Sequence, residues 1–132
     1  MKYGEDAQLN ATPSALPKLM VLVVGETARA ENFSLNGYTK NTNPELSKQD
    51  IVNFSQVSSC GTATAVSVPC MFSGMPRKDY DERLASHREG LLDVAKRAGY
   101  QVTWIDNNSG CQGACDRVEQ FKIPEPLKQK RC

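Results

Sequence analysis

The sequence predicts an α/β fold built around a mainly parallel sheet. Two observations predict it: the β-branched-rich run Leu19–Val24 shows no polar alternation, and strand-like segments alternate with helical ones along the chain. A strand without alternation is typical of one buried on both faces, as in a parallel sheet covered by helices. The chain has 132 residues, 39% of them hydrophobic and 23% charged, which allows one core and excludes a disordered tail.

The chain is expected to begin with a linker, which the folded domain follows. Residues 1–18 contain two prolines and several polar stretches, which predict a linker or tail, and the domain would cover 19–132. After the first strand the sequence signals for secondary structure are weaker. They predict two short helical stretches and one strand, over 27–32, 44–49 and 51–57.

The second half of the chain contains the clearest helical pattern. Leu84 and Leu91 fall on one face of a helix expected over 81–98, which Asp79 or Asp81 can cap and Gly99 can end. A strand is expected over 100–105. His87 lies away from the apolar face and is expected to be solvated.

Charge and hydropathy exclude some classes of partner. A net charge of +1 gives no basic footprint for nucleic acid. The longest apolar run is far shorter than the roughly 18 residues of a membrane span. The first six residues lack the features of a signal peptide.

Five cysteines point to an oxidising compartment. Cys60 and Cys70 form one close pair, Cys111 and Cys115 form another, and Cys132 is the last residue. Two close pairs and one remaining cysteine favour disulfides. A zinc site made by the four paired cysteines, or free buried thiols, are the alternatives, although the spacing does not match the usual zinc ribbons.

Polar side chains follow each expected strand, where ligands of parallel sheets collect. Glu26 follows the first strand, 58–64 follows the second, and Asn108 belongs to the Asp106-Asn-Asn segment after the third. Strand ends commonly lead into polar loops, so this pattern alone does not establish a site. Glu26 is either a carboxylate ligand for a divalent metal or a glutamate favoured by a helix dipole.

The segment between Cys60 and Cys70 is expected to be a hydroxyl-rich loop with candidate nucleophiles. They are Thr62, Thr64 and Ser67. A hydroxyl needs a base or a metal to become nucleophilic at neutral pH. A threonine at a helix N-terminus would also place backbone N–H groups beside a phosphoryl group. The alternative is a small turn in which the hydroxyls serve as caps.

Four segments together resemble the phosphoethanolamine transferases that act on lipid A, including the mobilised colistin-resistance enzymes. The segments are Val23-Val-Gly-Glu-Thr-Ala-Arg-Ala-Glu-Asn-Phe33, Asn36-Gly-Tyr38, Ser59-Cys-Gly-Thr-Ala-Thr-Ala-Val-Ser-Val-Pro-Cys-Met-Phe72 and Asp106-Asn-Asn-Ser109. The resemblance covers 19–132 and implies the alkaline-phosphatase/sulfatase-like α/β/α sandwich, incomplete in this chain.

The resemblance also implies an activity. Such enzymes move phosphoethanolamine from phosphatidylethanolamine to lipid A through a phosphothreonine intermediate, at the periplasmic face of the bacterial inner membrane, and confer polymyxin resistance. Their amino-terminal membrane helices and their later Ser-Asp-His-Gly-Glu block do not occur in this sequence. The chain therefore resembles the first part of the catalytic domain and is expected to be inactive alone.

Residue roles follow by motif. Glu26 resembles a zinc ligand and Thr64 the zinc-activated nucleophile, while Asn108 resembles a residue of the phosphoethanolamine site. Gln112 stands where many relatives have lysine, so this position lacks the lysine's cationic contact to substrate phosphate. The two close cysteine pairs resemble family disulfides, and Cys132 would pair with a cysteine outside this sequence.

Two other functions remain open at this point. One is a non-catalytic, disulfide-stapled binding module. The other is a related sulfatase-like phosphodiesterase or phosphotransferase. The sequence does not indicate an oligomeric state.

Overall fold

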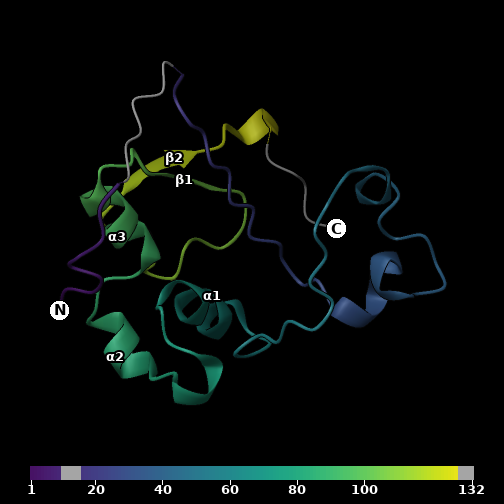
Figure 1. Ribbon diagram of the computed structural model, residues 1–132, viewed down its shortest axis with the longest axis horizontal. Helices are drawn as coiled ribbons and strands as arrows, with labels where there is room; N and C mark the ends of the chain where they lie inside the picture. The colour runs from purple at the N-terminus through teal and green to yellow at the C-terminus, as the bar shows by residue number, and fades with distance from the viewer. Residues whose placement is uncertain (10–15, 128–132) are drawn as a thin grey trace. The chain divides into compact units, whose positions relative to one another are not determined.

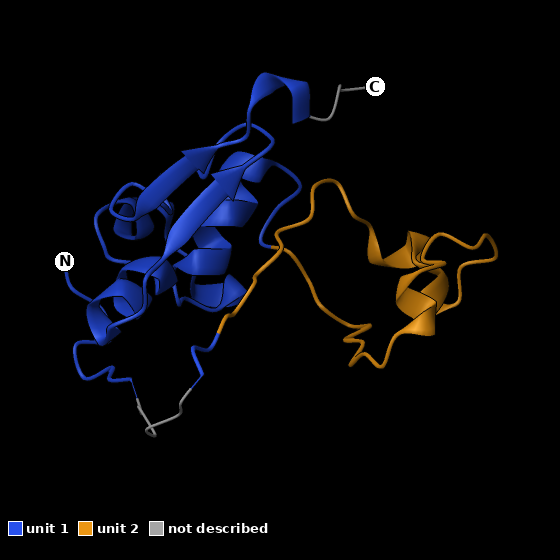
Figure 2. Ribbon diagram, turned by 90° about the horizontal axis from the view of Figure 1, so that it is seen from above, with its two compact units in different colours: residues 1–18, 60–132 blue, residues 19–59 orange. Residues whose placement is uncertain are grey.

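The structure is a computed structural model that describes residues 1–9 and 16–127. It divides into two compact units, which Figure 2 draws in blue and orange. Unit 1 comprises residues 1–18 and 60–132, and unit 2 comprises residues 19–59.

Unit 1 contains the α-helices and the sheet (Figure 1). Its elements are α1 (Thr64–Phe72), α2 (Glu82–Ser86), α3 (Leu91–Ala98), β1 (Thr103–Asp106) and β2 (Glu119–Lys122). The two strands pair in parallel, with Thr103 opposite Glu119 and Asp106 opposite Lys122. The parallel pairing agrees with the sheet type that the sequence predicted.

Helix α1 replaces the loop expected between the first two cysteines. Small and β-branched residues and the internal Pro69, which lacks an N–H, argue against a helix by local propensity. Burial of Val68, Cys70 and Phe72 outweighs that preference. The helix therefore depends on tertiary packing, which a local pattern does not reveal.

The single helix expected over 81–98 is wrong, because the chain forms α2 and α3 with a break between them. Gly90 has extended backbone dihedrals at the N-cap of α3. A Cβ at Gly90 would lie 2.7 Å from the carbonyl oxygen of Phe72, so the end of α1 requires a glycine here. The predicted caps are confirmed: Asp81 accepts a hydrogen bond from the Leu84 N–H at 2.8 Å, and Gly99 ends α3 with φ +112°.

The core of unit 1 lies between α3 and the strands. One cluster in it consists of the buried Cys111, Cys115 and Val118, and the partly buried Leu92, Val102, Trp104 and Ala114 pack against them. Phe72 of α1 meets Trp104 of β1 edge-on, with ring centroids 5.8 Å apart. The strand expected over 100–105 is confirmed by β1, whereas β2 was missed because Glu119–Lys122 holds a single apolar residue.

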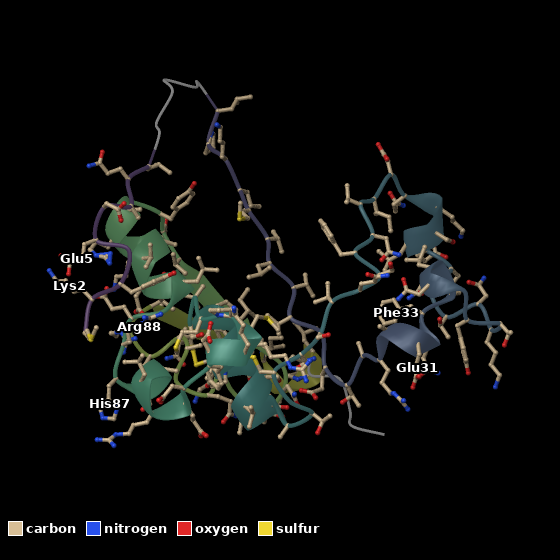
Figure 3. The ribbon with its side chains drawn as sticks, turned by 60° about the horizontal axis from the view of Figure 1, so that its bottom comes forward. Lys2, Glu5, Glu31, Phe33, His87 and Arg88 are labelled. Atoms are coloured by element: carbon tan, nitrogen blue, oxygen red, sulfur yellow. A yellow bond between two sulfur atoms is a disulfide. The ribbon has the colours of Figure 1, made fainter. Side chains whose placement is uncertain are left out.

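Residues 1–9 contact the region of α2 and α3. The amino group of Met1 donates to the His87 carbonyl at 2.8 Å, and the guanidinium of Arg88 lies 4.4 Å from the ring centre of Tyr3. Figure 3 shows His87 at the edge of this unit, and its side chain is exposed as expected. These contacts place residues 1–9 in unit 1, while the domain boundary after residue 18 stays a prediction.

Unit 2 contains three 3₁₀ helices in place of the two helical stretches expected there. They are Ala30–Asn32, Ser34–Asn36 and Leu46–Lys48. The Thr42 hydroxyl donates to the Asn32 carbonyl at 2.6 Å and accepts from the Ser34 N–H at 2.9 Å, which joins the turns. Gly37 ends the second turn with φ +96°, a left-handed conformation that glycine adopts without steric cost.

The strands expected over 19–24 and 51–57 are wrong. Leu19 is 88% exposed and Val23 is 82% exposed, so the run predicted to be buried on both faces faces solvent. A strand needs a neighbour for its backbone hydrogen bonds, and within 1–9 and 16–127 the one ladder joins β1 and β2. Apolar composition alone therefore did not make these segments strands.

Candidate functional site

Thr64 is the first residue of α1. The residue before it, Ala63, has extended dihedrals (φ −97°, ψ 136°) and no side-chain oxygen, so no N-cap side chain bonds to the helix. The first turn carries the partial positive charge of a helix start. Thr64 is half-buried whereas Thr62 is exposed, so the two hydroxyls have different surroundings.

The Cys60–Cys70 disulfide joins the approach to α1 with its last turn. The two Cα atoms lie 6.4 Å apart. A Cβ at Gly61 would meet Cγ1 of Val66 at 3.1 Å, so the chain before the helix runs close to its first turn. The disulfide and this close approach together fix how the chain enters the helix at Thr64.

The loop after β1 carries Asn108 and Gln112. The Asp106 carboxylate accepts hydrogen bonds from the Asn108 N–H at 3.3 Å and the Gly110 N–H at 3.2 Å, which folds the loop back on the strand end. Gln112 has a left-handed φ of +53°, and its side-chain amide donates to the Ser109 carbonyl at 3.2 Å. Both Asn108 and Gln112 are exposed, so they are accessible to a ligand.

The Cys111–Cys115 disulfide holds the middle of the same loop. Its Cα atoms are 5.7 Å apart, and Cys115 is 1% exposed. Both predicted pairs are thus confirmed, and the alternative zinc site made by the four cysteines is wrong. Cys132 lies outside the described residues, so its pairing stays a prediction.

An ion pair joins this loop to α3. Arg117 donates from Nε to Oδ1 of Asp93 at 2.8 Å and from Nη2 to Oδ2 at 2.7 Å. The Gly90 N–H adds a third bond to Oδ2 at 2.9 Å. Sequence reasoning missed this pair, because the two residues lie 24 positions apart and neither belongs to a recognisable motif.

Several interactions determine the protonation of Asp93. Burial raises the pKa of its carboxyl, but the bonds from Arg117 and Gly90 and the charges of Arg117 and Lys96 outweigh burial. The net effect lowers this pKa below its ordinary value. Asp93 therefore carries a negative charge at neutral pH despite its burial.

We expect Asp93→Asn to destabilise the protein at pH 7 by about 1–3 kcal/mol, because Arg117 loses its charged partner. A carboxyl with a lowered folded-state pKa stabilises above its unfolded pKa of about 4, and this stabilisation is lost as the pH falls through the folded pKa. Urea denaturation at pH 7 and pH 3 should therefore show a difference between wild type and variant that shrinks at pH 3. An equal difference at both values would contradict a charge effect, and exposed Asp116→Asn is the control.

We expect the Cys60–Cys70 disulfide, which closes a separation of 10 residues, to contribute about 2.5–3 kcal/mol in the chain-entropy model. Alkylation followed by intact-mass measurement should find both close pairs oxidised in protein from an oxidising host. Finding four reactive thiols would disprove the pairing. The Cys60→Ala/Cys70→Ala variant should be less stable than the wild type by this amount when both are measured without reductant.

Glu26 lies in unit 2 and is exposed. The hydroxyl of Thr27 donates to its Oε1 at 3.0 Å, which orients the carboxylate. Thr27 has a φ of +52°, a left-handed conformation that a β-branched residue rarely adopts. Such strain is concentrated at functional sites in proteins, and Thr27 and Gln112 are the two non-glycine residues with positive φ in the described ranges.

The predicted site residues divide between the units. Thr64, Asn108 and Gln112 belong to unit 1, and Glu26 belongs to unit 2. Within the described residues no group of three or more His, Cys, Asp or Glu side chains could hold a metal ion. A catalytic zinc usually has three protein ligands, so these residues do not make a zinc site by themselves.

Comparisons with known proteins show which family and which relatives the chain is similar to. The sequence profile of the sulfatase family matches residues 18–128. The phosphoethanolamine transferase EptA of Salmonella typhimurium is 55% identical over 129 residues, covering 95% of this chain and 23% of that protein. The phosphatidylethanolamine transferase Mcr-2 of Escherichia coli is 48% identical over 118 residues, covering 88% of this chain and 22% of that protein.

A solved structure of a phosphoethanolamine transferase is also similar to this chain. The integral membrane protein lipooligosaccharide phosphoethanolamine transferase A from Neisseria meningitidis matches with a TM-score of 0.81 and 52% identity, covering 87% of this chain and 22% of that one. The predicted sulfatase-like α/β fold is thereby confirmed, with less than a quarter of each of these proteins represented. None of the helices in the described ranges has the length and apolarity to cross a membrane.

Proposed function

The chain belongs to the sulfatase family, and from that premise we propose that it is part of a phosphoethanolamine transferase acting on lipid A. Relatives that bear this activity in their names match most of the chain at about half identity. The observation that carries the proposal is the position of Thr64 at the start of α1, after an N-cap residue without a side-chain oxygen. This is where a helix best accommodates a phosphoryl group.

In the proposed first step, Oγ of Thr64 attacks the phosphorus of phosphatidylethanolamine. The bond from phosphorus to the diacylglycerol oxygen breaks, that oxygen leaves as the alcohol with a proton, and the threonine hydroxyl gives up its own proton. Negative charge that develops on the phosphoryl oxygens lies beside the helix start and its partial positive charge.

In the second step a phosphate oxygen of lipid A attacks the same phosphorus, the bond to Thr64 Oγ breaks, and Oγ takes up a proton, which restores the threonine hydroxyl. Dividing the transfer into two displacements is the usual use of a covalent nucleophile. Asn108 would bind the phosphoethanolamine group. Gln112 would bind it by hydrogen bonding alone, because an amide carries no charge. The modified lipid A would attract cationic peptides such as polymyxins less strongly.

Zinc is the proposed cofactor of the whole enzyme. Glu26 and Thr64 are the residues of this chain that would hold it, through a carboxylate and a hydroxyl oxygen. When bound, zinc lowers the pKa of a coordinated hydroxyl. No step above is assigned to it, because the described residues do not complete a site. The proposed location is the periplasmic face of the bacterial inner membrane.

A transfer assay with the whole enzyme tests the proposal. Phosphatidylethanolamine labelled in its headgroup is incubated with the enzyme, with and without lipid A. Label that moves to lipid A supports a transferase. Label released as free phosphoethanolamine in both samples would instead indicate a phosphodiesterase, and no turnover with any phosphodiester would favour a binding module.

A further inference from the structure

The carboxylate of Asp93 attaches another part of the chain to α3 through hydrogen bonds. The residue is 7% exposed and accepts three hydrogen bonds, two of them from the planar fork of Arg117. Bidentate pairs of this kind fix orientation as well as distance. Lys96, also on α3, donates from Nζ to the Arg117 carbonyl at 2.7 Å, so the helix holds this residue by side chain and backbone.

Arg117 ends the segment of residues 107–117, which we call the substrate loop. Asp106 holds its first turn, and the Cys111–Cys115 disulfide closes its middle. Asn108 lies in the turn that Asp106 holds, Gln112 lies inside the ring that the disulfide closes, and Arg117 follows both. The disulfide constrains the inside of the loop, and its cluster packs against Leu92 of α3. The Asp93–Arg117 pair adds a directional, hydrogen-bonded connection to the same helix, which apolar packing does not supply.

A cavity of about 90 Å³ lies beside this pair. The end of α1 lines it through Phe72 and Ser73, and the substrate loop lines it through Gln112 and Arg117. Asp93 is part of the same lining. The pair therefore lies where the C-terminal end of α1, opposite to Thr64, approaches the part of the loop that carries Gln112.

We propose that Asp93 and Arg117 are positioning residues, whose bidentate pair holds the substrate loop in the conformation in which Asn108 and Gln112 bind the donor. This inference rests on the proposed function. Neither residue touches the donor in this account. Loss of the pair should weaken donor binding equally in the ground state and the transition state, which raises KM and leaves kcat in place.

The test uses the whole enzyme with phosphatidylethanolamine and lipid A. Asp93→Asn should raise KM for the donor about tenfold, with kcat per folded enzyme within about twofold. Arg117→Gln should raise KM for the donor. Arg117→Lys keeps the positive charge, so it should raise this KM less than Arg117→Gln does. The double variant Asp93→Asn/Arg117→Gln should be no worse than either single variant, because both remove one interaction.

Arg97→Gln is the matched control. Arg97 also lies on α3 and its Nη2 pairs with Oε2 of Glu89 at 2.8 Å, but its partners lie outside the substrate loop. This variant should lose stability without a change in KM. A KM that stays unchanged in Asp93→Asn, or that rises equally in Arg97→Gln, would overturn the positioning role.

Hydrogen exchange separates this inference from the proposed function. In Asp93→Asn, amides of the substrate loop should exchange faster while those of α1 stay as in the wild type. Faster exchange with a normal KM means that the pair holds the loop without positioning the donor site, which overturns the inference and leaves the function intact. A wild-type enzyme without transfer activity would overturn the proposed function, and the positioning role with it.

Discussion

Thr64→Ala should abolish transfer to lipid A in the whole enzyme, with a loss of more than about 1,000-fold in kcat, because the attacking oxygen is removed. The substitution leaves Cys60, Cys70 and the buried face of α1 unchanged, so expression and disulfide content should match the wild type. Alanine is also a good helix former, and α1 should persist. The measurement is turnover of labelled phosphatidylethanolamine, normalised to folded enzyme.

Thr62→Ala is the matched control. Thr62 lies two residues away in the same disulfide-closed segment but is exposed and outside α1. Its variant should keep substantial activity. Near-normal turnover in Thr64→Ala, or a comparable loss in Thr62→Ala, would contradict the assignment of the nucleophile.

Glu26→Gln should lower transfer about 100-fold and reduce the zinc content of the purified whole enzyme. Replacing a carboxylate by a neutral amide removes an anionic oxygen ligand. Loss of an outer-shell partner already costs about 10- to 100-fold, and a direct ligand should cost at least as much. The left-handed Thr27, whose hydroxyl bonds to Glu26, would still orient the amide, so the loss would report charge and ligand type.

Glu31→Gln is the control for this variant. Glu31 is an exposed carboxylate of the same unit, paired with Arg29. It should leave zinc content and turnover unchanged. Full zinc content together with normal activity in Glu26→Gln would show that Glu26 is not a metal ligand.

Local signals predicted part of the fold well. Asp81 and Gly99 were recognised as caps because their chemistry acts within one helical turn. The strand at Thr103–Asp106 and both short-range disulfides followed from patterns spanning a few residues. These features depend on little beyond their own segment of the chain.

The elements that the sequence predicted wrongly or missed all depend on contacts between residues that are distant in sequence. The break at Gly90 is imposed by the carbonyl of Phe72, and β2 forms because β1 provides its ladder. Leu19–Val24 has the composition of a buried strand but is exposed, because composition does not supply a pairing neighbour. A pattern describes one segment at a time, so it could not detect these effects.

The candidate site shows the same division. Residue types and strand ends suggested Glu26, the hydroxyls near Thr64 and Asn108, but the choice of Thr64 over Thr62 and the role of Gln112 came from resemblance to a family. The Asp93–Arg117 pair was found only in the structure, because neither a motif nor a periodic pattern relates the two positions.

The most direct test of the account is the chemical identity of the intermediate. The whole enzyme is incubated with phosphatidylethanolamine in the absence of lipid A, and peptides spanning Cys60–Arg77 are analysed by mass spectrometry after reduction. The account predicts a phosphoethanolamine adduct on Thr64 that disappears when lipid A is added. An adduct on Thr62 or Ser67, or transfer to lipid A without any adduct on this peptide, would contradict it.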